Sequence, residues 1–232
     1  MRSTPTAAAQ PASEEIHLRI DGQQPLSADT VAAVTAVCEA AEDLDGRASV
    51  VVRVSGVPHG PWPGDLTVSL VSKWERALRR LERLPATTVA VADGDCGGPA
   101  LDVLLATDHR IATGSVRLVV PVEGGGTWPG MALYRLAGHG ANAAPIRRAV
   151  LYGTPVDAAH ALALHLIDEL TDDVPKALLI AAERARTVSG TELAIRRQLL
   201  HDAAGTSFEE ALGVHLAACD RALRRATTGA DA

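Results

Sequence analysis

The segment from Thr87 to Ala112 constrains the fold of this chain more than any other. Its first six residues, Thr-Thr-Val-Ala-Val-Ala, are apolar and β-branched, which is typical of a buried strand. Residues 93–98 contain three glycines and two aspartates and predict a sharp turn. Pro99 suits the first position of a helix, and the seven residues after it are apolar apart from Asp102, which predicts a buried helix. A helix that opens from a glycine turn gathers unpaired N–H groups, so the sequence predicts a site for an oxyanion or an anion here.

Size and charge limit the classes of protein that this chain can represent. Its 232 residues are enough for one sizeable domain, and 47% of them are hydrophobic, so a packed core is expected. Aromatic residues make up only 3%, so that core must be mostly aliphatic. The net charge of −6 gives no reason to expect binding to nucleic acid.

Cysteine usage and the absence of long apolar runs suggest a location. The three cysteines, Cys38, Cys96 and Cys219, are odd in number and have no metal-binding spacing, which favours a reducing cytoplasm and no metal site. No apolar run approaches the ~20 residues of a membrane span, so no membrane partner is expected. Residues 1–15 have no apolar signal-peptide core and are predicted to be a disordered tail.

Local patterns predict the other elements. Strands are predicted at 16–20, 48–54 and 116–120, and helices after Ser27, over 67–84, after Asp157, from Pro175 to Thr187 and after Ser207. The stretch from Glu123 to Gly126 is predicted to be a flexible loop. His165 is expected to end its helix in a left-handed conformation, which histidine tolerates better than most residues.

Several motifs resemble one known family. Residues 91–112 read Val-Ala-Asp-Gly-Asp-Cys-Gly-Gly-Pro-Ala-Leu-Asp-Val-Leu-Leu-Ala-Thr-Asp-His-Arg-Ile-Ala. This run resembles, without a gap, the V-N-G-x-x-x-G-G-G-x-E-L-A-x-x-C-D-x-R-I-A signature of the crotonase (enoyl-CoA hydratase/isomerase) superfamily. Gly64–Leu66 is similar to the family's A-G-A-D-L, and Pro121–Glu123 and Trp128–Gly130 are similar to its P-E-x and I-P-G. Residues 151–168 resemble its L-L-T-G-x-x-I…A-x-x-x-G-L-V-D.

The resemblance implies a fold and a ligand. The fold is α/β, a spiral of β-β-α units over residues 16–174, with a helical region at 175–232 that builds trimers, or hexamers from two trimers. The ligand is an acyl-CoA thioester, which serves as substrate without a separate cofactor. Arg76, Arg79, Arg80 and Arg83 share one face of the helix predicted at 67–84. This basic face is either a solvated surface or, as the resemblance allows, a contact for CoA phosphates.

The thioester-binding positions depart from the family pattern. Family members hold the thioester oxygen with two backbone N–H groups, of which the first corresponds to Gly64. The second corresponds to Pro99, which has no N–H to donate. Gly98 or Ala100 could supply that donor only if the turn shifts by one residue.

The acid/base positions depart as well. The two glutamates of the hydratases correspond to Asp102 and Val122, with Glu123 one position further along. Asp102 either moves a proton in catalysis or acts like a cap that holds the glycine turn. Glu123 is either an acid/base group or a solvated loop residue.

Within the family, two runs resemble the small crotonase-like branch of dihydroxyphenylglycine biosynthesis, which assists a type III polyketide synthase. They are Asp-Gly-Asp-Cys-Gly-Gly-Pro-Ala-Leu-Asp and Arg-Leu-Val-Val-Pro-Val-Glu. One implied function is an enzyme that dehydrates and aromatises a CoA-bound polyketide to 3,5-dihydroxyphenylacetyl-CoA. The other is a catalytically weak accessory protein that binds the synthase or its product.

Overall fold

The computed structural model describes residues 14–44, 47–60, 66–140, 143–186, 188, 190–203 and 205–230. Of the predicted tail at 1–15, residues 1–13 lie outside these ranges. The first strand, β1 (Glu14–Asp21), begins two residues before the predicted strand start.

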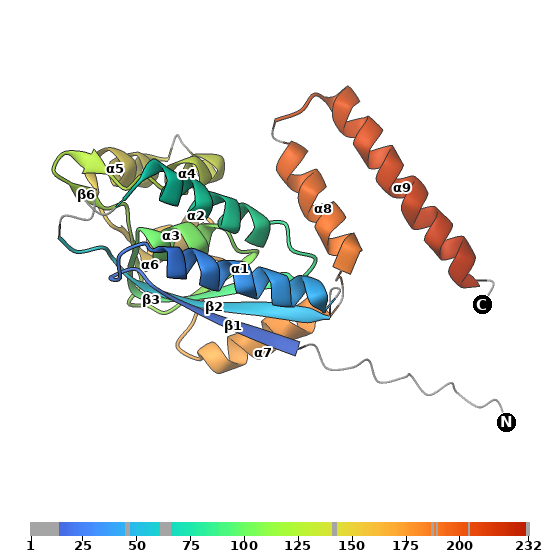
Figure 1. Ribbon diagram of the computed structural model, residues 1–232, viewed down its shortest axis with the longest axis horizontal. Coiled ribbons are helices and arrows are strands. Elements are labelled where there is room, and N and C mark those ends of the chain that lie inside the picture. Colours follow the sequence, from blue (N-terminus) through green and yellow to red (C-terminus); the bar gives the residue numbers. More distant parts are fainter. Residues whose placement is uncertain are drawn as a thin grey trace.

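A mostly parallel sheet forms the centre of the molecule (Figure 1). β1 is followed by β2 (Ala48–Gly56), β3 (Thr87–Gly97), β4 (His109–Ala112) and β9 (Glu169–Leu170), each parallel to its neighbour. β5 (Arg117–Val119) runs parallel to the end of β3 and antiparallel to β8 (Val156–Asp157). Val and Ala dominate β2 and β3 because parallel strands at the centre of a sheet are buried on both faces.

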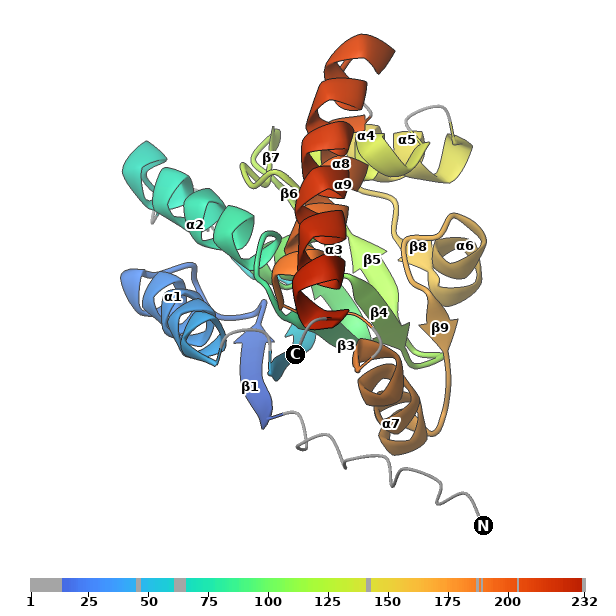
Figure 2. The same ribbon diagram turned by 90° about the vertical axis from the view of Figure 1, so that its right-hand side faces the viewer.

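Helices cover both faces of this sheet. The larger core lies under α1 (Ala28–Asp43), α2 (Val68–Leu81) and α3 (Pro99–Leu105). On the other face lies α7 (Val174–Ala185), as Figures 1 and 2 show. Side chains alternate along β3, so Ala90 and Ala92 join the larger core whereas Val89 and Val91 pack against α7.

The remaining elements lie at the two ends of the sheet. Near the carboxyl ends of the strands are β6 (Val122–Glu123), β7 (Gly126–Thr127), α4 (Ala132–Gly140), α5 (Ala144–Tyr152) and α6 (Ala158–Ala163). At the opposite end, α8 (Gly190–Ala203) and α9 (Phe208–Ala230) form a pair that projects from the body (Figure 1). None of the helices in the described ranges combines the length and apolarity that crossing a membrane requires.

The glycine-rich turn after residue 92 is shorter than the sequence predicts. β2 and β3 pair through Val54 and Ala92 and again through Gly56 and Cys96, so residues 93–95 bulge opposite a single residue of β2. The strand then resumes, because β5 provides a new partner for it as far as Gly97. The prediction of a turn throughout 93–98 is therefore wrong for its second half.

The predicted loop at Glu123–Gly126 is a two-stranded hairpin. Val122 pairs with Thr127 and Glu123 with Gly126. The two residues between the strands, Gly124 and Gly125, have φ angles of 58° and 81°. Tight hairpin turns of this kind need positive φ at both central positions, which glycine adopts without strain.

Several predicted helix ends are confirmed. Ser27 accepts a hydrogen bond from the Thr30 amide at 3.2 Å, and Asp157 accepts one from the His160 amide at 2.9 Å. Ser207 and Glu210 exchange the reciprocal bonds of a capping box. His165 has a φ of 55°, as expected for a left-handed helix end.

Candidate functional site

An open pocket of about 340 Å³ lies between the chain after β2 and the β6–β7 hairpin. Its walls are mostly aliphatic, and its lining residues are Val57, Pro58, Val119, Val120, Pro121, Val122, Glu123, Tyr152 and Gly153. Of these, only Glu123 carries a charge at neutral pH. Among the described lining residues, the pocket therefore combines several aliphatic side chains with one carboxylate, which can exchange a proton with a bound molecule.

Glu123 sits on the solvent-exposed hairpin at the edge of the pocket. Its position on β6 is fixed by pairing with Gly126 of β7. A carboxylate in this place can reach a bound molecule and also exchange protons with water. Its predicted acid/base role stays a prediction.

The predicted oxyanion residues are only partly described. Gly64 lies outside the described residues. Gly98 precedes α3 and has a φ of 53°; a Cβ there would lie 2.5 Å from the Pro58 ring, so only glycine fits. Pro99 and Ala100 are buried in the first turn of α3. Gly98 thus packs directly behind the pocket wall that Pro58 forms, and Pro99 supplies no N–H there.

Asp102 is completely buried, and its carboxylate accepts three hydrogen bonds. The indole Nε1–H groups of Trp74 and Trp128 donate to Oδ2 at 3.1 and 2.8 Å. The Ala132 amide donates to Oδ1 at 3.1 Å. The side chain thus joins α2, α3 and the start of α4. Among the described residues, no side chain makes a capping hydrogen bond at Gly98, the residue before α3.

Burial raises the pKa of Asp102 from 3.8 to about 6, with a further rise from the nearby charge of Glu75. The two indole bonds act in the opposite direction and lower this pKa. All three surrounding groups are donors, so they fit the ionised carboxylate. At neutral pH the residue is accordingly a buried anion held by directed N–H groups.

A second group of charges supports the same region. Arg135 on α4 donates to Glu75 at 3.1 Å and to Glu82 at 2.6 Å, both on or next to α2. Glu75 also accepts the Met131 amide at 2.7 Å, directly before α4. These bonds tie the start of α4 to α2 beside Asp102.

The sequence placed Trp74 on an apolar helix face and Trp128 in the motif that resembles I-P-G, but it did not pair either residue with Asp102. The available signal is composition: tryptophan occurs three times in 232 residues, and a buried indole N–H needs an acceptor. Asp102, the one charged residue of an apolar helix, is the matching acceptor. Pairing them requires knowledge of the fold, since 28 and 26 residues separate the partners.

Other candidate groups take no part in this pocket. Cys96 is fully buried, its thiol contacts the Val54 carbonyl at 3.6 Å, and burial raises its pKa to about 12, as expected for a packed and unreactive thiol. Within the described ranges, no cluster of three or more His, Cys, Asp or Glu side chains could hold a metal ion.

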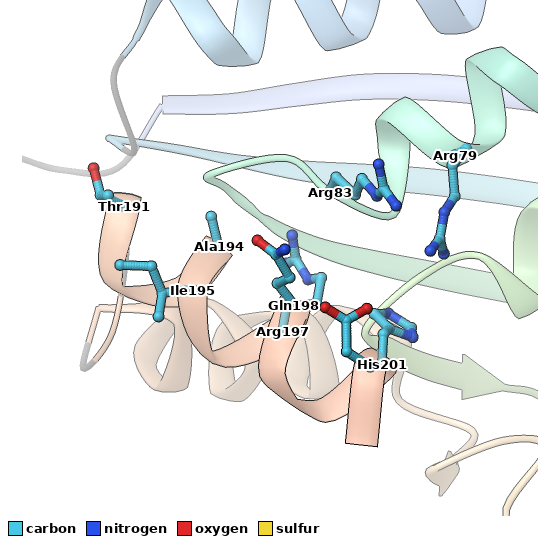
Figure 3. A pocket seen from close by; sticks show the side chains of 9 residues that line it. Arg79, Arg83, Thr191, Ala194, Ile195, Arg197, Gln198 and His201 are labelled. Carbon is cyan, nitrogen blue, oxygen red and sulfur yellow. The ribbon is translucent and has the colours of Figure 1, made fainter. Parts of the chain in front are cut away.

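A smaller cavity of about 180 Å³ separates α2 from α8 (Figure 3). Arg79 and Arg83 reach it from the α2 side, and Gln198 and His201 reach it from α8. Arg79 is already paired with Glu82 at 2.9 Å, and Asp202 also lines the cavity. The predicted contact of this arginine face with CoA phosphates stays a prediction.

Known proteins resemble this chain in sequence and in fold. An enoyl-CoA-hydratase from Amycolatopsis orientalis is 54% identical over 214 residues, which cover 92% of this chain and 98% of that protein. No protein-family model matches the chain.

Two solved structures illustrate the similarity in fold. An enoyl-CoA hydratase/isomerase from Marinobacter aquaeolei has a TM-score of 0.76 at 18% identity and covers 90% of this chain and 88% of its own. An enoyl-CoA hydratase from Polaromonas sp. JS666 has a TM-score of 0.76 at 16% identity, with 95% and 92% covered. The predicted α/β fold class is confirmed. With a relative of this identity over nearly the whole length of both proteins, the chain belongs to the crotonase (enoyl-CoA hydratase) superfamily.

Proposed function

We propose that the protein binds an acyl-CoA thioester and adds water to, or removes water from, its acyl chain. The observation that carries the proposal is the carboxylate of Glu123 at the edge of a pocket whose other described lining residues are uncharged. The name of the Amycolatopsis orientalis relative, enoyl-CoA-hydratase, supports the same chemistry.

The proposed reaction needs one carboxylate and one thioester site. The acyl chain lies beside Pro58 and Pro121, and the family resemblance assigns the amide donor for the thioester oxygen to Gly64. In the dehydration direction, Glu123 removes the proton from the α-carbon, and the negative charge moves to the thioester oxygen. Glu123 then gives this proton to the β-hydroxyl group, the C–O bond breaks, water leaves and a C=C bond forms. Hydration is the reverse.

The thioester site is expected to be weak. Pro99 has no N–H, and loss of one oxyanion donor typically lowers the rate by about 10²–10³-fold. We therefore expect slow turnover of simple enoyl-CoA substrates.

For the natural substrate we propose a CoA-bound polyketide made by a type III polyketide synthase, with 3,5-dihydroxyphenylacetyl-CoA as product. The sequence similarity to the dihydroxyphenylglycine branch supports this choice. The ring side chains of Pro58, Pro121 and Tyr152 around the pocket also suit a ring-forming acyl group.

A second function is favoured by a different observation. Asp102 is enclosed by three donors, so this carboxylate is not free to act as a second acid/base group with Glu123. In this alternative the protein is an accessory that binds the synthase or its product and raises the yield without moving protons itself.

One set of assays separates the two functions. The purified chain is incubated first with crotonyl-CoA and 3-hydroxyacyl-CoA, and then with a type III synthase and malonyl-CoA, with products followed by mass spectrometry. If the protein is an enzyme, it turns over a CoA thioester alone, and Glu123→Gln lowers kcat about 10²-fold or more.

The exposed variant Glu15→Gln, on β1, serves as the matched control and is expected to leave kcat unchanged. An accessory protein raises synthase output only when the synthase is present, and Glu123→Gln has no effect on it. If the protein turns over no CoA thioester and also leaves synthase output unchanged, both proposed functions are wrong.

A further inference from the structure

The chain from 128 to 132 wraps around the carboxylate of Asp102. Trp128 donates to it from its indole and Ala132 donates from its amide. Gly130 passes so close that a Cβ at this position would overlap Oδ2 of Asp102. A glycine is therefore required between the two donors, and the carboxylate determines the path of the segment.

Trp128 also closes the base of the hairpin that carries Glu123. It directly follows β7, and its backbone N–H donates to the Pro121 carbonyl at 2.9 Å, just before β6. The side chain of Trp128 is 3% exposed, whereas every residue of the hairpin from 122 to 127 is exposed. The hairpin is therefore anchored in the protein core at Trp128.

The same indole borders the wall of the pocket. A Cβ at Gly98 would lie 3.6 Å from Cδ2 of Trp128 and 2.5 Å from the Pro58 ring. The indole thus packs against the turn before α3, behind Pro58, which lines the pocket. The position of the Trp128 indole therefore affects both the pocket wall at Pro58 and the Glu123 carboxylate at the edge of the pocket.

We propose that Asp102 is the positioning residue for Glu123. It acts through the Trp128 indole, which fixes the base of the hairpin and with it the place of the Glu123 carboxylate on the pocket. The inference rests on the proposed function, in which Glu123 moves the proton. Asp102 thereby has a role in the reaction without contact with substrate, in place of the acid/base role that its position in the sequence suggests.

The structure provides a matched pair of variants. Trp74 and Trp128 donate to the same oxygen, but Trp74 comes from α2 and Trp128 from the base of the hairpin. Both indoles are buried, so Trp74→Phe and Trp128→Phe each remove one buried N–H and a similar volume. Only Trp128→Phe also removes the side-chain bond that anchors the base of the hairpin; the backbone bond from residue 128 to Pro121 remains.

The first measurement is hydrogen exchange of the amides from 122 to 127, by millisecond labelling of the purified full chain without substrate. We expect faster exchange in Trp128→Phe and unchanged exchange in Trp74→Phe. Asp102→Asn, which keeps the size of the side chain but loses its charge, is expected to show a smaller increase of the same kind. If Trp128→Phe does not fold, Asp102→Asn is compared with the wild type in its place. Equal hairpin exchange in the wild type, Trp128→Phe and Asp102→Asn would overturn the proposal.

The second measurement is turnover of the CoA substrate found for the wild type. Displacement of Glu123 by about 1 Å is expected to lower kcat about 10²-fold in Trp128→Phe with KM nearly unchanged. Trp74→Phe is expected to keep kcat within about 2-fold. Equal losses of kcat in the two variants contradict positioning. If the hairpin loosens selectively but the wild type turns over no CoA ester, the anchoring holds and the proposed function is wrong.

Discussion

At the scale of residues, one carboxylate connects three separate parts of the chain. Asp102 accepts from Trp74 on α2, from Trp128 after β7 and from Ala132 at the start of α4. Each of these buried N–H groups would lose its partner if the carboxylate were removed, and an unsatisfied buried donor costs about 1–3 kcal/mol. The residue therefore determines local structure whatever its part in the reaction.

Stability should depend on pH through Asp102. The pKa of this group is about 6 in the folded protein against 3.8 for an ordinary aspartate, because burial disfavours the charge. The folded state thus binds the proton more tightly, and the group's stabilising contribution is complete below about pH 4 and lost as the pH rises through about 6. A shift of this size corresponds to about 3 kcal/mol.

Urea unfolding of the wild type and Asp102→Asn measures this contribution. The difference in free energy of unfolding between the two proteins should change by about 2 kcal/mol between about pH 4 and pH 7, with the wild type losing stability relative to the variant. Subtracting the two curves removes the titration of other carboxylates. Glu75 and Arg135 lie close by, so Glu75→Gln should shift the midpoint of the difference curve to lower pH. A difference that is constant over this range contradicts the buried titration.

At the scale of elements, short-range rules predicted more than long-range ones. The helix starts at Ser27 and Asp157 and the end at His165 depend on neighbours within four residues, so the sequence contains the whole signal. The continuation of β3 to Gly97 depends on β5, which begins 20 residues later, and the sequence predicted a turn instead. In the candidate site, Glu123 was proposed from the family resemblance, and its catalytic role stays a prediction. The contacts of Trp128 with Asp102 and Pro121 could not be predicted from the sequence, because they are tertiary contacts.

Arg197 connects α8 to the body of the protein. Its guanidinium is buried and donates to the Leu84 carbonyl, to the Ala86 carbonyl at 3.1 Å and to Asp108 at 2.8 Å. Replacement by methionine keeps the aliphatic stem of the side chain but removes the guanidinium that donates to the Leu84 and Ala86 carbonyls.

Arg197→Met should destabilise the protein by about 2–4 kcal/mol, since the buried carbonyls of Leu84 and Ala86 lose their donor and each unsatisfied buried group costs about 1–3 kcal/mol. The neighbouring Arg196, exposed and paired with Glu192, provides the control, and Arg196→Met should stay within about 0.5 kcal/mol of wild type. Urea unfolding at neutral pH measures both. Similar midpoints for the two variants would show that the buried bonds of Arg197 do not hold α8.

At the scale of the whole molecule, α8 and α9 project from the body (Figure 1). On α9, Phe208 is 75% exposed and Leu216 is 57% exposed, and Leu212 lies one turn before Leu216. Large exposed apolar side chains at helical spacing indicate a surface that meets another chain. The trimer or hexamer implied by the sequence stays a prediction.

Light scattering after gel filtration tests this assembly. We expect a particle three or six times the 24.1 kDa mass of one chain. The double variant Leu212→Asp with Leu216→Asp should dissociate it, because charges on an apolar interface are expensive to bury. Val214→Asp, on the opposite side of the same helix, is the control and should leave the mass unchanged. A stable wild-type monomer at micromolar concentration would refute the assembly.

The shared acceptor of Trp74 and Trp128 also has an optical consequence. Excitation of an indole moves electron density away from its N–H, so a negative charge beside Nε1 lowers the energy of the excited state and shifts the emission to the red. Two of the three tryptophans in the chain have Nε1 against the same carboxylate oxygen. The natural fluorescence of the protein is thus a built-in indicator of the charge on Asp102, and it needs no added dye.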